Sequence, residues 1–384
     1  MSAVRTGARP EQQTGRQAGG GSSPIHPALH DARARELPRR NPLRTTIVIV
    51  TLLVALVFSV LISAGVGQLS LSPGEVLHTL TRPLGFAIGA EPAHQHAENA
   101  VWTIRLPRLV MALAVGTALA VAGVLMQAVF GNPLAEPGVV GVSSGAALGA
   151  SAVIVFGLSF MGEWTVALVA FTGGLLATLV VYFFSRAGGR TEVVTLILTG
   201  VAINAFCGAG LAMLSFLGDT QAREQIVFWQ LGSLNGSRWV QVAVVVPLVI
   251  IGVLLSVLLT RSLDLLALGE KQARHLGVNV ELLRIAAIVL VALLVGAAVA
   301  FAGIIAFVGL VVPHLMRMII GPRHGPLLIT SALGGALLLT VADLVARTAI
   351  RYADLPLGML TALVGGPFFF YLLARTRRRS GGWA

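Results

Sequence analysis

The sequence predicts an all-α polytopic membrane protein of about ten transmembrane helices. Three observations lead to this fold class: the chain is 56% hydrophobic and only 11% charged, apolar runs recur along nearly its whole length, and its cations gather in alternate connections. A mean hydropathy of +0.86 and 44 glycines among 384 residues are typical of a chain whose solvent is lipid. We therefore expect the bilayer to surround most of the fold.

Apolar runs of roughly 17 to 25 residues are long enough to cross a hydrocarbon layer of about 30 Å as helices. The runs are continuous rather than alternating, which favours helices over barrel strands. Ten runs follow one another, at about 45–64, 109–130, 139–158, 164–185, 193–217, 240–260, 285–302, 304–320, 327–347 and 357–374. The seventh and eighth runs are separated by almost nothing, so nine spans is the competing count.

The 27 Lys and Arg residues predict how the chain crosses the membrane. With ten spans and a cytoplasmic N-terminus, most of them fall in cytoplasmic segments, as the positive-inside rule requires. The seven exceptions are Arg82, Arg105, Arg108, Arg223, Arg238, Arg347 and Arg351. We expect a multi-pass protein of the cell (inner, cytoplasmic) membrane with both termini in the cytoplasm.

The two ends of the chain differ from its middle in composition. Residues 1–44 are rich in Gly, Ser, Pro and Arg and show no apolar periodicity, which predicts a disordered basic cytoplasmic tail. Residues 45–375 would form the transmembrane domain. Residues 376–384 would form a short cytoplasmic C-terminal tail.

Two spans resemble each other in sequence. Residues 112–123 read ALAVGTALAVAG and residues 292–303 read ALLVGAAVAFAG, which agree at eight of twelve positions without a gap. By the predicted topology these two spans cross the membrane in opposite directions. This indicates an inverted repeat of spans 2–5 and 7–10, an arrangement found in transporters. Chance similarity between Ala- and Gly-rich helices is the alternative.

The usual motifs for nucleotide binding and for zinc catalysis are missing from the sequence. There is no G-x-x-x-x-G-K-[ST] loop, since the single lysine, Lys271, is followed by glutamine, and H-E-x-x-H and Cys clusters are also missing. We expect no enzymatic activity and no cofactor. We also expect no metal site, because His94 and His96 lack a third ligand at suitable spacing. Nucleic acid is not an expected partner, because the net charge of +11 has no soluble face to carry it.

A few polar side chains fall at membrane depth, where they are costly. The candidates for lining a translocation path are Gln127, Asn132, Glu136, Asn204 and His314. The alternative is a packing role, in which they satisfy backbone groups opened by nearby prolines. Asp343 and Arg347 stand four residues apart on one helical face, which predicts an ion pair.

The stretch ALGEKQARHLGV, residues 267–278, places charges between two long apolar runs. Gly269 and Gly277 bracket about two turns of possible helix, and four-residue spacings inside it predict two charge pairs and an apolar stripe. The pairs are Glu270 with Arg274 and Lys271 with His275, and the stripe is Ala273, Leu276 and Val280. A short amphipathic helix of this kind suits docking into a protein groove, and a solvated loop is the alternative.

Four stretches carry longer motifs. They are RLPRLVMALAVGTALAVAGVLMQAVFGNPLAEPGVVGVSSGAALGA (105–150), LALGEKQARHLGV (266–278), FVGLVVPHLMR (307–317) and ADLVARTAIRYADLPLGMLTALVGGPFFFYLL (342–373). In this order they resemble the permease family of ABC importers for ferric siderophores, haem and cobalamin, the FecCD-type or type II importers. The resemblance covers roughly residues 45–375.

The resemblance implies a permease that pairs with a second copy around a central path, driven by two cytoplasmic ATPases. A substrate-binding protein outside would offer acidic residues to Arg105, Arg108 and Arg347. Lipid phosphates are the alternative partners of these arginines. The charged stretch resembles the family's coupling helix, which seats in the ATPase. The matching residues are Leu268, Gly269, Glu270, Lys271, Ala273, Arg274, His275, Leu276 and Gly277.

We interpret the chain as the membrane subunit of an ABC importer for an iron complex, haem or a ferric siderophore. The GPRHGP turn at 321–326 and the closing GGWA resemble haem-type members a little more. Two alternatives stay open: the same family with cobalamin as cargo, and a proton-coupled secondary transporter, which also uses inverted repeats. A proton-coupled carrier would need buried carboxylates in mid-span, and only Asp343 and Glu136 come near.

Overall fold

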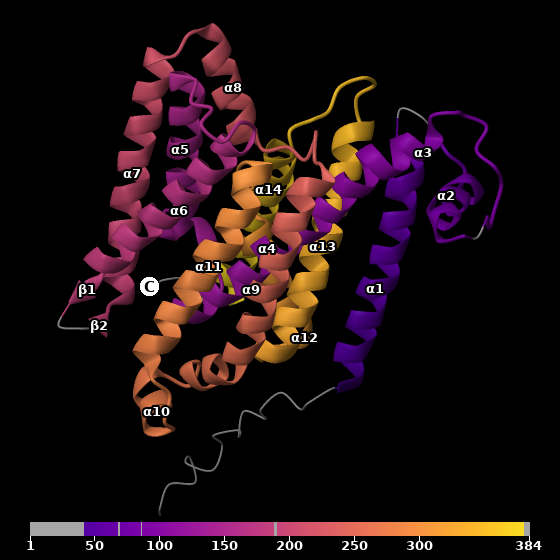
Figure 1. Cartoon of the computed structure of the whole chain (residues 1–384). Helices are drawn as coiled ribbons and strands as arrows, with labels where there is room; N and C mark the ends of the chain where they lie inside the picture. Colours follow the sequence, from indigo (N-terminus) through magenta and orange to yellow (C-terminus); the bar gives the residue numbers. More distant parts are fainter. Residues whose placement is uncertain (1–41, 68–69, 86, 188–189, 380–384) are drawn as a thin grey trace, which may run out of the picture. The chain divides into compact units, whose positions relative to one another are not determined.

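Helices build almost all of the computed structural model, which describes residues 42–67, 70–85, 87–187 and 190–379 (Figure 1). In chain order the elements are α1 (Pro42–Gly65), α2 (Pro73–Thr81), the 3-10 turn η2 (Arg82–Leu84), α3 (Ala97–Asn99), the π-helix η3 (Ala100–Arg105), α4 (Leu106–Val129), the 3-10 turn η4 (Pro137–Val140), α5 (Val142–Phe156), α6 (Trp164–Phe184), β1 (Arg186–Ala187), β2 (Arg190–Thr191), α7 (Val193–Leu217), α8 (Thr220–Leu231), α9 (Trp239–Leu266), α10 (Glu270–His275), α11 (Val280–Ala302), α12 (Val308–Ile320), α13 (His324–Thr348) and α14 (Leu357–Arg379). The predicted all-α class is confirmed, since β1 and β2 form only a two-residue antiparallel pairing.

Ten of these helices coincide with the ten predicted apolar runs. Seven are long and apolar enough to cross a membrane, and three are shorter: α5, α12 and the part of α14 from Leu357 to Tyr371. The ten apolar runs form ten helices rather than nine, because α11 and α12 are separate helices. Gly303 and Phe307 between them both have positive φ, at 67° and 68°, a conformation that a continuous α-helix does not adopt.

The first helix begins and the last helix ends near the predicted domain boundaries, which stay a prediction. The helix α1 starts at Pro42, inside the last residues of the predicted tail, and α14 continues to Arg379, past the predicted start of the C-terminal tail. Proline at the first helical position leaves no unsatisfied amide there, which suits a helix start. The rest of the predicted N-terminal tail lies outside the described residues.

The helix α4 forms the centre of the bundle and packs against α9, α11, α12 and α13. Small side chains allow this, because the backbones of α4 and its neighbours nearly touch at two crossings. A Cβ atom on Gly116 would overlap the carbonyl oxygen of Gly335 in α13, and a Cβ atom on Gly123 would overlap that of Gly309 in α12. Small residues therefore allow close helix packing at these two crossings.

The inverted repeat stays a prediction. Its two proposed copies lie in α4 and α11, which contain the two most buried membrane windows of the described chain, at 83% and 72%. In contrast, the windows in α1 and α7 are only 17% buried and expose large apolar side chains. Equivalent central positions for α4 and α11 are what a repeat would require.

The connections divide between two ends of the bundle. The helices α2, α3 and α8 and the α13–α14 loop lie at one end, whereas α10 and the β1–β2 hairpin lie at the other (Figure 1). We refer to these as the α2 end and the α10 end. The residues predicted to dock a binding protein and those predicted to contact an ATPase therefore belong to opposite ends.

Candidate coupling and docking sites

A short helix forms in the charged stretch between α9 and α11. Gly269 precedes α10 with a φ of 110°, and Gly277 follows it with a φ of 85°, so both positions favour glycine. The amide of Gly277 donates to the carbonyl of Arg274 and that of Val278 to Ala273, which closes the C-terminal end of the helix. The two glycines thus turn the chain sharply on either side of α10.

The sequence predicted one apolar stripe on α10, formed by Ala273, Leu276 and Val280. The structure does not expose these three residues together on one face. Ala273 is fully buried and Val280 is 2% exposed, whereas Leu276 is 58% exposed. The cause is the pair of turns, which fold α10 against the ends of α9 and α11 and direct Ala273 inward. Leu268, just before Gly269, is 61% exposed. The apolar surface offered to a partner therefore consists of Leu268 and Leu276.

Glu270 forms the charge pair that four-residue spacing predicted. Its carboxylate lies 3.5 Å from the Nη2 of Arg274, at an exposed position. The same carboxylate also accepts a hydrogen bond from Arg284 of α11, a residue the sequence interpretation did not assign to this site. Lys271 and His275 are exposed on the remaining side of the helix. The site is thus fixed to the bundle through Glu270 and open to a partner through its leucines and cations.

Arg108 does not lie at the surface of the α2 end. Its side chain is 10% exposed, and its Nε donates to the Oδ1 of Asp343 at 2.8 Å. Its Nη1 donates to the Oδ2 of Asp354, in the α13–α14 loop, at 2.7 Å. The anionic partners that this arginine needs are therefore inside its own chain.

Arg105 and Arg347 both bind the C-terminal end of α1. The Nη1 of Arg105 donates to the carbonyls of Ala64 and Gly65 at 2.6 and 3.0 Å. Arg347 donates to the carbonyl of Val66 at 2.6 Å and to both oxygens of Ser63. Helix C-termini leave carbonyls unpaired and carry partial negative charge, so cations stabilise them.

The predicted ion pair between Asp343 and Arg347 is also present, at 3.8 Å. Asp343 is therefore shared by Arg347 and Arg108, with the shorter contact going to Arg108. Charge-assisted hydrogen bonds of this kind are stronger than those between neutral groups.

The polar residues at membrane depth have identifiable contacts. Gln127 is buried and donates to the carbonyl of Leu310 at 3.2 Å, which joins α4 to α12. The Oδ1 of Asn132 accepts a bond from the amide of Leu134 within its own turn. The Oδ1 of Asn204 in α7 accepts a bond of 2.6 Å from the hydroxyl of Ser144. These three contacts are packing contacts, and the path role of these residues stays a prediction.

Glu136 and His314 lie beside the break between α11 and α12. The Oε1 of Glu136 accepts a long bond of 3.5 Å from the amide of Phe307, the positive-φ residue that precedes α12. The Nδ1 of His314 is buried and has no hydrogen-bond partner among the described residues. Glu136 thus makes one long contact here, and His314 leaves one ring nitrogen without a hydrogen-bond partner among the described residues.

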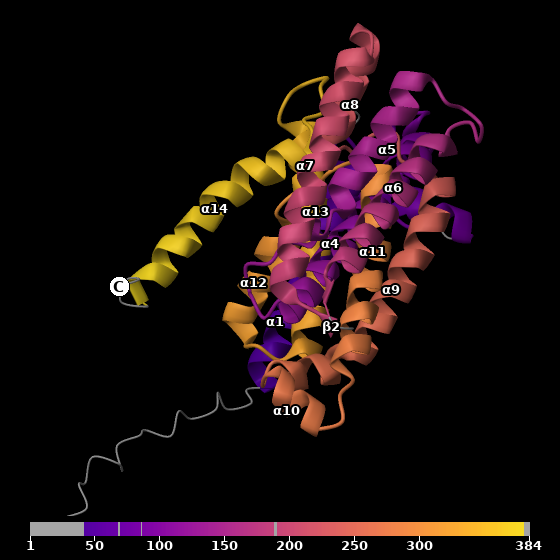
Figure 2. The ribbon, with the colours of Figure 1, turned by 90° about the vertical axis from the view of Figure 1, so that its left-hand side faces the viewer.

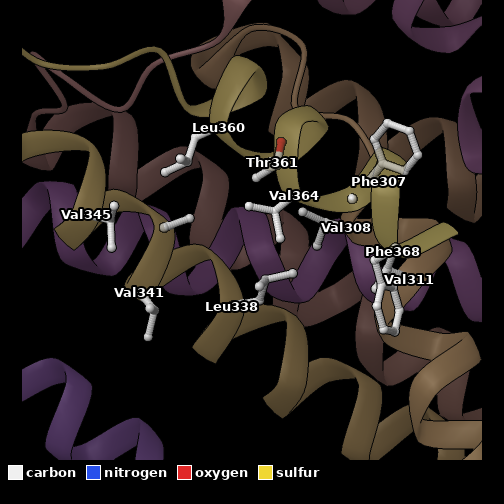
Figure 3. A pocket seen from close by; sticks show the side chains of 12 residues that line it. Phe307, Val308, Val311, Leu338, Val341, Val345, Leu360, Thr361, Val364 and Phe368 are labelled. Carbon is white, nitrogen blue, oxygen red and sulfur yellow. The ribbon is translucent and has the colours of Figure 1, made fainter. Parts of the chain in front are cut away.

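A hollow of about 250 Å³ lies between α12, α13 and α14. Figure 3 shows the side chains that line it: Phe307, Val308, Val311, Leu338, Val341, Val345, Leu360, Thr361, Val364 and Phe368 carry the labels. The hydroxyl of Thr361 is the single polar side-chain group among those labelled. Sites for charged cargo require several placed polar groups, so this hollow does not suit an iron complex. Figure 2 shows that α14, which lines one side of this hollow, leans away from α12 and α13.

The family model of the FecCD transport family matches residues 55–375. The chain belongs to the FecCD transport family. The resemblance drawn from the four motifs is therefore confirmed. As a FecCD chain it is a multi-pass membrane permease of an ABC importer, and the match covers the greater part of its length.

Curated relatives of this FecCD chain include transporters for two cargoes. The hemin transport system permease protein HmuU of Yersinia pestis is 42% identical over 338 residues, which cover 86% of this chain and 96% of HmuU. The cobalamin import system permease protein BtuC of Halobacterium salinarum is 42% identical over 279 residues, which cover 72% and 74% of the two chains. Among solved structures, an inward-facing metal-chelate type ABC transporter superposes with a TM-score of 0.76 at 33% identity, over 86% of this chain and 99% of that chain.

Proposed function

We propose that this FecCD permease imports an iron complex, haem or a ferric siderophore, across the cytoplasmic membrane. A homodimer of the chain would enclose the path, and two separate ATPases would bind at the α10 end, which would face the cytoplasm together with both termini. The observation that carries the proposal is α10 itself, a short helix between two sharp turns, with one exposed leucine just outside each of its ends. An apolar knob of this kind fits a groove in a partner protein.

The choice of an iron complex rests on the similarity to HmuU. That relative, a hemin permease, is covered over 96% of its length, against 74% for the cobalamin permease at the same identity. Cobalamin therefore remains the competing cargo within the family.

The three outer arginines would serve docking of a substrate-binding protein indirectly. Arg105 and Arg347 fix the end of α1, and Arg108 fixes the α13–α14 loop through Asp354. We infer that they hold the docking surface in shape at the α2 end. This replaces the simpler expectation that all three point at acidic residues of the partner.

The test uses the permease with its ATPase and binding protein in proteoliposomes. Uptake of haem should require ATP on the side of α10 and should continue in the presence of a proton ionophore. Ferric siderophore and cobalamin are offered under the same conditions. Uptake that stops with the ionophore, or that occurs only with cobalamin, would contradict the proposed energy source or cargo respectively.

A further inference from the structure

Arg284 is a buried cation at the α10 end. It lies in the second turn of α11 and is only 4% exposed. A guanidinium group cannot lose its proton in a protein, so its burial is costly unless acceptors surround it. The identity of those acceptors shows which parts of the structure depend on this residue.

The acceptors of Arg284 belong to two other segments. Its Nη2 donates to the Oε1 of Glu270, the first residue of α10. Its Nη1 donates at 2.8 Å to the carbonyl of Thr191, in β2. Glu192 alone separates Thr191 from α7, so the guanidinium bridges α10 to the beginning of α7.

A second residue of α11 strengthens the same junction. Glu281 accepts bonds from the amide of Thr191 at 2.9 Å and from its hydroxyl at 2.6 Å. Thr191 is therefore held by α11 from two sides, through an anion and a cation. Thr191 lies 90 and 93 residues away from these partners along the chain, so the junction is made by tertiary structure alone.

Covalent connections join α10 only to α9 and α11. A displacement of α10 would reach α7 through another route, and the Glu270–Arg284–Thr191 bridge is a direct one. The planar guanidinium donates in fixed directions, so it transmits position better than a flexible point charge. The helix α7 is among the most exposed spans. It therefore has fewer packing contacts through which a movement of α10 could reach it.

We propose that Arg284 is a positioning residue that makes α7 move together with α10 when the ATPase acts. This inference rests on the proposed function, because it assumes that α10 receives the ATPase. It adds to that function a noncovalent route from α10 to α7. Breaking the route should separate ATP hydrolysis from cargo movement rather than abolish either binding partner.

The test compares Arg284→Gln with the unchanged permease in the full reconstituted complex. We expect the ATPase to stay bound and hydrolysis to persist, while cargo moved per ATP falls by about tenfold. Arg238→Gln is the matched control, because Arg238 forms an ion pair of 2.7 Å with Glu163 at the α2 end. An unchanged ratio of cargo to ATP in Arg284→Gln overturns the inference, whether or not both rates decline together.

Arg284→Lys keeps the experiment decisive if the glutamine variant does not assemble. A lysine can reach Glu270 or the carbonyl of Thr191 but lacks the fork that holds both, so the ratio should fall part of the way. A ratio equal to that of the unchanged permease would overturn the inference.

Hydrogen exchange gives a readout that does not depend on cargo. Binding of the ATPase should slow amide exchange at residues 191–196 in the unchanged permease and not in Arg284→Gln. Equal protection in both proteins would overturn the inference. Absence of ATP-driven uptake in the unchanged complex, in contrast, would count against the proposed function.

Discussion

Arginines within the bundle are placed by their partners rather than by exposure. Arg108 lies between Asp343 and Asp354, and Arg284 lies between Glu270 and the carbonyl of Thr191. Each one joins segments that are far apart in sequence. In an apolar surrounding such pairs are costly to break, because the remaining partner keeps a buried charge.

The first residue-scale prediction concerns Arg108. Arg108→Met should leave Asp343 buried and more poorly paired and should lower the free energy of unfolding by about 3–5 kcal/mol. Arg82→Met is the control, because Arg82 pairs with Glu98 at 2.9 Å while 65% exposed, and the expected loss there is at most ~1 kcal/mol. Thermal unfolding of the purified permease in detergent measures both. Similar losses in the two variants would mean that the buried network contributes no more than a surface pair.

Sequence reasoning found the local pairs and missed the distant ones. The Asp343–Arg347 and Glu270–Arg274 pairs follow from four-residue spacing on a helix. The stronger contacts of Arg108 join residues 235 and 246 positions apart, and no periodicity of one chain specifies them. The arginines that depart from the positive-inside pattern indicated that anionic partners were needed. They did not indicate that these partners lie inside the same protein.

At the scale of elements, the long helices were predictable because length and hydropathy decide them in lipid. The short α2 and α8 were not predicted, although both have capping signals. Ser72 and Glu75 form a capping box before α2, and Asp219 accepts the amide of Ala222 at 2.7 Å before α8. These caps follow from residue type alone and could have been found in the sequence.

The stability of the α2 cap should depend on pH, and the pKa of Glu75 determines the direction of the change. Bonds from the amides of Ala93 and Ser72 hold the pKa of the Glu75 carboxyl below its usual range. A carboxyl with a lowered pKa in the folded state stabilises that state above its unfolded pKa and loses the effect as the pH falls through the folded value. The cap of α2 therefore weakens only in acid.

The element-scale prediction tests the crossing of α4 and α13. Gly335→Val would place a Cβ atom against the carbonyl of Gly116 and 2.6 Å from the Cβ of Ala120, so the helices must separate. We expect a loss of about 1–3 kcal/mol or more in the free energy of unfolding. Gly325→Val in the same helix is the control, because a Cβ atom there meets nothing within 4 Å. Equal melting temperatures for the two variants would contradict the close crossing of α4 and α13.

At the scale of the whole permease, the two ends of the bundle have separate contacts. The α10 end exposes Leu268 and Leu276, whereas the α2 end contains the network of Arg105, Arg108 and Arg347. The central helix α4 has 24 residues, which at 1.5 Å per residue spans about 36 Å. A substitution at one end should therefore leave binding at the other end unchanged.

Leu276→Asp tests this separation. An exposed leucine that becomes buried in a partner contributes roughly 1.5–3 kcal/mol, whereas an exposed charge pair contributes only ~0.2–1 kcal/mol. The variant also places a carboxylate against an apolar groove. We therefore expect Leu276→Asp to lose the ATPase on pull-down and to lose uptake, while the binding protein still docks at the α2 end.

Lys271→Ala, in the neighbouring turn, should weaken ATPase retention much less. Loss of the ATPase with Lys271→Ala but not with Leu276→Asp would show that α10 docks through its charged side, and loss of binding-protein docking with Leu276→Asp would show that the two ends are not independent.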